Sequence, residues 1–304
     1  MSKFLYVIGE GIGNMVQTLP TLKTLRKEHQ VDVVVAKSSF GIPRDFFDGG
    51  LLFLDDLTHE SVVDYDGKIE TIWGHIHGKD CQPLKSLPTV NQMDRQQMRL
   101  DVSEVRTYLN AAEDLGMKED DFEYSVSEML QTTPMSQRYD VVLANGYNYV
   151  NTADRWIAKS YPYYGSVSLR LQSAGYSVCS VGSNLEVIPN TVDETGWDLK
   201  QSAWLIQQAK LVISNDSAAY HIASALGKFN FVLFTFTSKE KNFDSDFHWK
   251  ALKVTRELDC QSDCHQNLKW KSCPHMNCRE MRFGDIAEHA LTVLRQIEEA
   301  SKNG

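Results

Sequence analysis

AKLVISNDSAAYHIASALGKFNFVLFTFTS, Ala209 to Ser238, carries the strongest structural signal in this chain. An apolar, β-branched run predicts a strand that ends at Asn215-Asp216-Ser217, and a helix is expected to start there at once. A second apolar strand follows the helix, so the segment predicts a strand–helix–strand unit of a parallel sheet. The N–H groups at the start of the helix would face the carboxyl edge of that sheet, where α/β proteins bind their ligands.

Strands and helices also alternate in the first half of the chain. Lys3–Ile8 predicts a strand, residues 14–29 predict an amphipathic helix, and Val31–Lys37 predicts a second strand. The segment WGHIHG, residues 73–78, is expected to be a strand with both of its histidines on one face. Those histidines would line the wall of a pocket or belong to a plain strand, and a metal site there is disfavoured.

The alternation is interrupted once. Ser125–Arg138 is a polar stretch with the composition of a linker, and strand-like sequence resumes at Tyr139. We therefore expect an α/β fold with two doubly wound domains, residues 1–138 and residues 139–304.

The last helix is expected over residues 285–300, where the apolar residues share one face. Asp285 and Glu288 have the spacing of a capping box at its start. This helix is expected to pack back on the first domain.

The composition limits the class of protein. A chain of 304 residues with 42% hydrophobic residues can bury a large core. The net charge of −9 repels nucleic acids and anionic lipids at long range, although a local basic groove is compatible with it. The apolar run near the N-terminus, Phe4–Ile8, is much shorter than a signal peptide or a membrane span, so we expect a cytoplasmic protein.

The loop after the first strand matches part of a dinucleotide-binding fingerprint. Gly9, Gly11 and Asn14 give G-x-G-x-x-N, so the third glycine is missing, although Gly13 lies beside its position. The second strand ends in Lys37, where an NAD-binding domain has an acidic residue, which disfavours NAD and leaves NADP as a weak option. The alternative is that the glycines only serve a tight strand-to-helix turn.

Ser217 and His221 lie four residues apart, so they share one face of the expected helix. The imidazole can therefore lie beside an anion held at the helix start, and a diphosphate would fit there. A purely structural interpretation is also open, in which Asp216 caps the helix and His221 is an ordinary hydrogen-bonded histidine.

The segment Ala209–Ser238 resembles the donor-binding motif of the heptosyltransferase family of GT-B glycosyltransferases, Asp-Ser/Thr-Gly-x-x-His. Residues 12–28 are similar to the first loop and leucine-rich helix of that family. Residues 159–186 resemble its lysine-led segment and the Gly-x-x-x-Glu after the next strand, and residues 198–217 resemble the helix before the donor loop. Several segments thus agree in order along about half of the chain.

The resemblance implies a GT-B fold, in which two Rossmann-like domains face a central cleft. It also implies an enzyme that moves a sugar from a nucleotide-diphosphate sugar to an acceptor hydroxyl with inversion and without a catalytic metal. The first domain would bind the acceptor and the second domain the donor. The acceptor implied is a bacterial glycan or a lipopolysaccharide-type saccharide.

The resemblance further implies roles for single residues. Lys159 and the helix start at Ser217 would meet the charge of the leaving diphosphate, and Glu186 would accept hydrogen bonds from ribose hydroxyls. Asp216 would contact a sugar hydroxyl or orient a neighbour, and His221 would donate to phosphate or sugar. The full set implied to bind the donor is Gly11, Gly13, Lys159, Glu186, Asp216, Ser217, Ala218 and His221.

Two positions depart from the family pattern. The family usually has an aspartate after the Ile-Gly of the first loop as the base for the acceptor hydroxyl, and this chain has Asn14, whose amide is not a base at neutral pH. Either Glu10 replaces that base, or Asn14 only orients the acceptor while another group takes the proton, or the chain binds the donor without turnover. Ala218 replaces the usual glycine and narrows the approach of the diphosphate to the backbone.

Other functions stay open at this stage. A glycosyltransferase acting on modified nucleic-acid bases would need a local basic cleft. A non-catalytic nucleotide-sugar-binding protein is suggested by Asn14, and an NADP-dependent oxidoreductase by the partial glycine pattern.

Four of the six cysteines lie close together in the segment 260–278, with the spacing Cys260-x3-Cys264-x8-Cys273-x4-Cys278. The spacing resembles the four-cysteine tail of some family members, and four thiolates suit a structural Zn or Fe site. Two histidines of the segment are spare ligands. The alternative is unligated thiols or adventitious disulfides.

Overall fold

The computed structural model describes residues 1–9, 11–35, 41–93, 101–146, 156–260, 264, 267 and 269–303. The chain forms two compact units. The first contains Met1–Gln131 and Phe243–Phe247, and the second contains Thr132–Asn242 and His248–Gly304. Each unit holds one parallel sheet, which confirms the predicted α/β fold with two doubly wound halves. Within the described ranges, no helix is long and apolar enough to cross a membrane.

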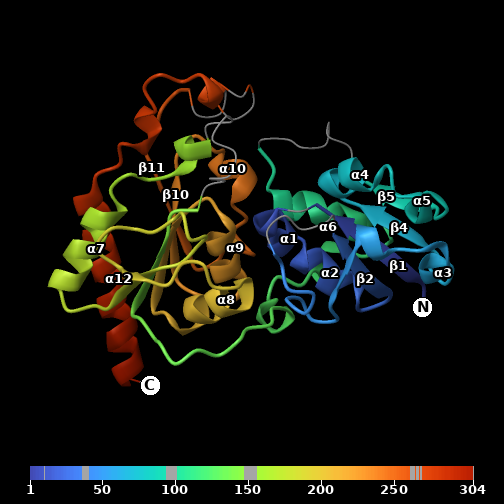
Figure 1. Ribbon diagram of the computed structural model, residues 1–304, viewed down its shortest axis with the longest axis horizontal. Helices are drawn as coiled ribbons and strands as arrows, with labels where there is room; N and C mark the ends of the chain where they lie inside the picture. Colours follow the sequence, from blue (N-terminus) through green and yellow to red (C-terminus); the bar gives the residue numbers. More distant parts are fainter. Residues whose placement is uncertain are drawn as a thin grey trace. The chain divides into compact units, whose positions relative to one another are not determined.

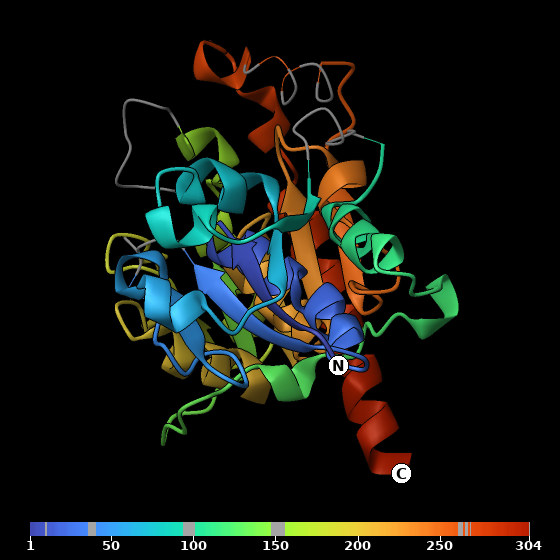
Figure 2. The same ribbon diagram turned by 90° about the vertical axis from the view of Figure 1, so that its right-hand side faces the viewer.

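The first unit is built on a five-stranded parallel sheet with the strand order β3-β2-β1-β4-β5. Its strands are β1 (Lys3–Ile8), β2 (Gln30–Val35), β3 (Leu51–Phe53), β4 (Gly67–Glu70) and β5 (Thr89–Gln92). Its helices are α1 (Ile12–Gln17), α2 (Leu19–Leu25), α3 (His59–Val62), α4 (Ile72–Gly78), α5 (Gln82–Lys85) and α6 (Glu104–Asp114). Figure 1 labels these elements apart from β3, and Figure 2 shows the same ribbon turned by 90°.

The apolar strands form the core of the first unit. β1 pairs with β2 on one side and with β4 on the other. Leu5 and Val7 of β1 are fully buried and pack with Val62 of α3 and Leu84 of α5. The longer of its two segments ends at Gln131, and the predicted domain boundary at residue 138 stays a prediction.

The segment predicted as one helix over residues 14–29 forms two helices, α1 and α2. Pro20 lies in the first turn of α2, where its missing N–H needs no partner. The hydroxyl of Thr18, between the two helices, donates to the carbonyl of Met15 over 2.7 Å. Leu19 and Leu22 are fully buried, and so are polar residues such as Gln17 and Thr21.

The prediction of a strand for WGHIHG is wrong, because this segment forms helix α4. Thr71 caps the helix, and its hydroxyl accepts from the N–H of Gly74 over 3.1 Å. A Cβ added to Gly74 would lie 2.0 Å from the carbonyl oxygen of Val7, so glycine is what allows the helix to dock on β1. His75 and His77 therefore belong to a helix at the end of β4.

The second unit is built on a six-stranded parallel sheet with the order β11-β10-β9-β6-β7-β8. Its strands are β6 (Val141–Ala144), β7 (Val178–Ser180), β8 (Val192–Asp193), β9 (Leu211–Asn215), β10 (Asn230–Phe234) and β11 (Ala251–Thr255). Its helices are η6 (Trp156–Lys159, a 3-10 helix), α7 (Tyr164–Ser173), α8 (Leu199–Gln208), α9 (Ala218–Ala225), α10 (Lys239–Asn242) and α12 (Phe283–Asn303). Figure 1 shows α7 and α12 on one face of this sheet and α8 and α9 on the other.

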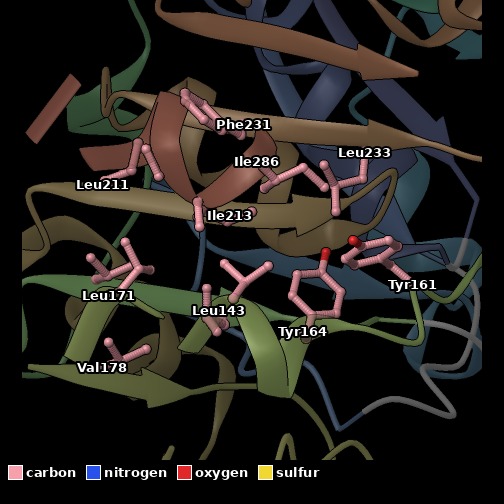
Figure 3. Close-up of a cluster of buried hydrophobic side chains, with 14 of the residues drawn as sticks. Leu143, Tyr161, Tyr164, Leu171, Val178, Leu211, Ile213, Phe231, Leu233 and Ile286 are labelled. Carbon is pink, nitrogen blue, oxygen red and sulfur yellow. The ribbon is translucent and has the colours of Figure 1, made fainter. Parts of the chain in front are cut away.

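The main core of the second unit lies between the sheet and the pair α7 and α12. Figure 3 shows Ile213 of β9 and Leu233 of β10 on the face that Ile286 of α12 covers. Helix α12 begins at Phe283, so Asp285 lies inside its first turn and the capping box predicted at Asp285 is wrong. The expected contact of this helix with the first domain stays a prediction.

Both sheets contain a topological switch point, where two neighbouring strands lead off in opposite directions. β1 leads to β2 and β4 leads to β5 in the first sheet, and β6 leads to β7 and β9 leads to β10 in the second. Right-handed crossovers then place the following helices on opposite faces, which leaves a crevice at the carboxyl ends of the strands. The glycine loop follows β1, and Asp216 follows β9.

Replacing Gly74 with alanine is expected to destabilise the first unit by about 3 kcal/mol, because the added methyl group would collide with the main chain of β1. Thermal unfolding measures the effect. Gly284→Ala is the matched control, since a Cβ at this helical glycine meets no atom within 4 Å and a neutral or slightly stabilising change is expected. Equal stability of Gly74→Ala and the wild type would contradict the docking of α4.

Candidate functional site

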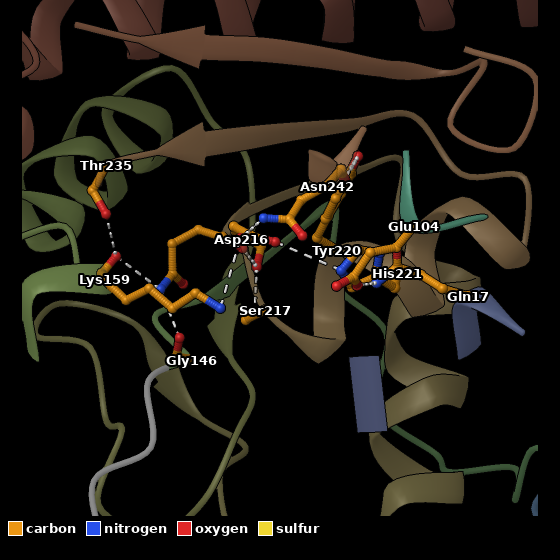
Figure 4. Close-up of polar contacts among 12 residues, drawn as sticks. Gln17, Glu104, Gly146, Lys159, Asp216, Ser217, Tyr220, His221, Thr235 and Asn242 are labelled. Carbon is orange, nitrogen blue, oxygen red and sulfur yellow. Dashed lines mark hydrogen bonds and ion pairs between the residues drawn. The ribbon is translucent and has the colours of Figure 1, made fainter. Parts of the chain in front are cut away.

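Asp216 follows β9 at the second switch point and is 4% exposed. Lys159 Nζ lies 3.6 Å from Oδ2 of this carboxylate, and the Asn242 amide donates to the same oxygen over 3.1 Å (Figure 4). His221 Nε2 lies 3.6 Å from Oδ1. Burial opposes ionisation of Asp216, but Lys159 and His221 outweigh it and hold the pKa of Asp216 well below its ordinary range. Asp216 is therefore charged at neutral pH.

The main chain of Lys159 is held by the strand ends around it. Its carbonyl accepts from the side-chain amide of Asn215 over 3.0 Å and from the hydroxyl of Thr235 over 3.4 Å. The Asn215 amide also donates to the carbonyl of Gly146 over 2.6 Å. Asn215 thus ties η6 and the loop after β6 to the end of β9, and this places the ammonium group beside Asp216. The side chain of Lys159 is 21% exposed, so a ligand can reach it.

Helix α9 begins directly after Asp216. Ser217 occupies the N-cap position, so the interpretation of Asp216 as the capping residue is wrong. The Ser217 hydroxyl lies 2.9 Å from that of Ser214. A Cβ on Gly146 would lie 2.8 Å from Ser217, which explains why a glycine faces the helix start. Ser217 and Ala218 are both partly exposed, and an anion can therefore approach the N–H groups of the first turn.

His221 lies in the first turns of α9, buried among aromatic rings. Its Nδ1 lies 3.2 Å from Nε2 of His248, and Tyr220 stacks on the His248 ring with 4.5 Å between centroids. The Tyr220 hydroxyl donates to the carbonyl of Asn242 over 3.2 Å. Both nitrogens of His221 thus face a partner, Asp216 on one side and His248 on the other, and this fixes the orientation of its ring.

Sequence reasoning missed Asn242 and His248. Asn242 lies 26 residues after Asp216, and His248 lies 27 residues after His221. No periodicity connects positions so far apart, because a strand and further loops lie between them. Only the fold brings these side chains to the end of β9.

Glu186 lies in the loop after β7 and folds back on its own turn. Its carboxylate accepts from the N–H of Ser183 over 2.8 Å. Gly182 has a φ of +142°, and a Cβ there would lie 2.7 Å from the Glu186 carboxylate. The glycine of the Gly-x-x-x-Glu spacing is therefore required by the turn that the glutamate closes. The role of Glu186 toward a ribose stays a prediction.

The first loop contributes Gly11, Gly13 and Asn14 to the described residues, whereas Glu10 lies outside them. Gly11 is the N-cap residue of α1, so Gly13 and Asn14 lie in the first turn of that helix. Asn14 is partly exposed. These residues stand at the first switch point, and their roles stay predictions.

The structure does not support the predicted metal site at Cys260, Cys264, Cys273 and Cys278. Among the residues that can be described, no group of three or more His, Cys, Asp or Glu is arranged to hold a metal ion. Cys264 and Cys278 are buried in an apolar cluster with Phe236 and Trp270, whose rings stack with 4.7 Å between centroids. Burial, followed by the neighbouring Cys273, raises the pKa of Cys278 to about 11.

The Asp216→Asn variant is expected to lose less stability on acidification than the wild-type protein does. The folded protein keeps Asp216 ionised because its pKa is lowered, while the unfolded chain binds a proton there below about pH 4. The charge therefore stabilises the fold above that pH, and this contribution falls with further acidification by up to about 1.4 kcal/mol per pH unit. Thermal unfolding of both proteins from about pH 6 to about pH 3 measures the difference. Parallel curves would contradict the assignment.

A comparison with protein families gives one match. Residues 68–266 match the model described as glycosyltransferase family 9 (heptosyltransferase). This match covers more than half of the chain. No curated protein matches the chain.

Solved structures share the fold. The family 9 glycosyl transferase from Veillonella parvula is 13% identical with a TM-score of 0.67, over 97% of this chain and 98% of that one. The E. coli ADP-heptose LPS heptosyltransferase II is 16% identical with a TM-score of 0.66, over 98% and 100%. The E. coli heptosyltransferase WaaC with ADP-2-deoxy-2-fluoro heptose is 15% identical with a TM-score of 0.61, over 88% and 97%. These similarities confirm the predicted GT-B fold.

Proposed function

The chain belongs to glycosyltransferase family 9 (heptosyltransferase), and on that premise we propose that it transfers a sugar from a nucleotide-diphosphate sugar to a saccharide hydroxyl with inversion. The observation that carries the proposal is the position of Lys159 beside the start of α9 at the second switch point. The donor class is supported by WaaC, which was solved with ADP-2-deoxy-2-fluoro heptose.

The second unit binds the donor in this proposal. Lys159 and the N–H groups at the start of α9 contact the diphosphate and stabilise the charge that grows on it as the sugar leaves. Asp216 carries a negative charge and repels phosphate, so it does not contact the diphosphate directly. It orients Lys159 and His221 or accepts from a sugar hydroxyl. His221 acts through Asp216, because its ring nitrogens face Asp216 and His248, and Glu186 accepts from the ribose.

The first unit binds the acceptor. Gly11 and Gly13 keep the backbone at the end of β1 open to the substrates, and Asn14 orients the acceptor hydroxyl. The hydroxyl oxygen attacks the anomeric carbon on the face opposite the diphosphate, which inverts that centre, and the proton of the hydroxyl passes to a base of the first unit. The bond from this carbon to the diphosphate breaks, and its electron pair leaves with the nucleoside diphosphate. No metal takes part in the transfer in this proposal, because Lys159 and the helix start meet the charge.

The acceptor proposed is a bacterial glycan or a lipopolysaccharide-type saccharide. Heptosyltransferase II, which shares the fold, is named as an ADP-heptose LPS enzyme. A modified nucleic-acid base is less favourable as acceptor, because the net charge of −9 repels a polyanion. A non-catalytic role is the remaining alternative, and a transfer assay separates it from the proposal.

Lys159→Met is expected to weaken the binding of the donor by about 10- to 100-fold, because it removes a charge-assisted contact to the diphosphate. Isothermal titration with the nucleotide diphosphate measures this loss. Lys302→Met, at an exposed position near the end of α12, is the matched control and is expected to bind as the wild type does. Equal affinities of Lys159→Met and the control would contradict the proposed position of the diphosphate.

A screen of nucleotides, nucleotide sugars and NADP tests the donor class. Nucleotide-diphosphate sugars are expected to raise the melting temperature, and native mass spectrometry identifies the bound species. Stabilisation by NADP alone would overturn the proposal. Binding of a nucleotide sugar with neither hydrolysis nor transfer would favour a non-catalytic protein.

A further inference from the structure

Glu70 ends strand β4 as a buried carboxylate, with 1% of its side chain exposed. Lys68 lies two residues earlier on the same face of the strand, and its Nζ donates to Oε1 of Glu70 over 3.0 Å. Oε2 lies 3.3 Å from Nδ1 of His75 on helix α4. Each oxygen of this buried carboxylate thus has a partner, which is the condition for burying such a charge.

Nδ1 of the His75 ring contacts Glu70, and the side chain as a whole is partly exposed to solvent. An ionised carboxylate can only accept, so Nδ1 must carry the hydrogen that lies toward Glu70. Nε2 is then the nitrogen with a lone pair. The His75 side chain is 43% exposed, whereas Glu70 behind it is shielded from solvent. This arrangement leaves a basic nitrogen available to a substrate and a carboxylate placed to stabilise the imidazolium.

The Glu70–His75 pair lies at the first switch point. Glu70 stands opposite Val7 in the register of β4 and β1, close to where the glycine loop begins. A Cβ on Gly9 of that loop would lie 2.3 Å from Cβ of Trp73, so α4 and the loop are in direct contact. His75 therefore shares a sheet edge with the loop that leads to Asn14, and this edge is where an open α/β sheet binds its ligand.

Transfer to a hydroxyl releases a proton, and a base must take it. Asn14 of the glycine loop offers only an amide, which does not accept a proton at neutral pH. Imidazole is the side chain most often used for this task. His75 supplies such a group at the same edge of the sheet.

We propose that His75 is the general base of the transfer and that Glu70 is its positioning residue; this inference rests on the function proposed above. Nε2 of His75 takes the proton of the acceptor hydroxyl while its oxygen bonds to the anomeric carbon. The bond from that carbon to the diphosphate breaks, and the electron pair leaves with the nucleoside diphosphate. The imidazolium is paired with Glu70 until it returns the proton to solvent. Lys68 is the other charged group at this carboxylate, and it stays paired throughout.

His75→Ala tests the assignment. With saturating nucleotide-sugar donor and saccharide acceptor, kcat is expected to fall by about 10²- to 10⁴-fold, while the affinity for the nucleotide diphosphate is unchanged. Added imidazole is expected to restore part of the rate, because it fills the space of the missing ring. His59→Ala, at an exposed histidine of the same unit on α3, is the matched control and keeps the wild-type rate.

His75→Gln separates a chemical role from a structural one. Glutamine can keep a hydrogen bond to Glu70 but cannot take a proton, so its rate is expected to be as low as that of His75→Ala. A wild-type rate in His75→Gln, or no loss in His75→Ala, overturns this proposal alone. A wild-type protein that binds the donor and transfers no sugar overturns the proposed function together with this inference.

The role of Glu70 is tested in two backgrounds. Glu70→Gln is expected to lower kcat by about 10-fold or more in the wild type and to have no further effect in His75→Ala, because a positioning residue acts only through the base. Additive losses would overturn the positioning role. Glu70→Gln leaves the buried Lys68 without its carboxylate partner. The double variant Lys68→Met/Glu70→Gln removes this unpaired charge, and it is compared in the same way with and without His75→Ala.

Discussion

Where two neighbouring parallel strands connect in opposite directions, the helices that follow them lie on opposite faces of the sheet. A crevice then remains at the carboxyl ends of the two strands, and the sites of this protein depend on that constraint. A carboxylate, a lysine and a histidine lie together at both switch points. Asp216 lies 3.6 Å from Lys159 and 3.6 Å from His221, and Glu70 lies 3.0 Å from Lys68 and 3.3 Å from His75. Each crevice thus has a buried carboxylate with one lysine and one histidine.

The two sets differ in what they leave open to solvent. The His221 side chain is 4% exposed and lies against a second imidazole, so its ring is locked, while the lysine beside it remains 21% exposed. At Glu70 the lysine is shielded, at 11% exposure, and the histidine is the open member, at 43%. A carboxylate, a lysine and a histidine therefore leave an exposed ammonium group in the second unit and an exposed imidazole in the first.

The sequence was informative where one physical effect dominated. β1, β9 and β10 each contain an apolar run, and α9 begins directly after β9, so these elements and the position of Asp216 could be predicted from the pattern. The prediction failed at α4 because the alternation in WGHIHG is weaker than the cap at Thr71 and the contact that Gly74 makes with β1. The short strands β5, β8 and β11 carry too little apolar sequence to be recognised. Asn242 and His248 depend on the fold itself, as do the partners of Glu70.

The stacked pair of Phe236 and Trp270 has a practical consequence. Phe236 directly follows Thr235, whose hydroxyl contacts the main chain of Lys159, and Trp270 is only 2% exposed. A bound anion that moved the main chain of Lys159 would also move Thr235 and Phe236, which stacks on the buried indole of Trp270. Intrinsic fluorescence at the blue edge of the emission spectrum should therefore report occupancy of the second crevice without a label, even in a chain with six tryptophans.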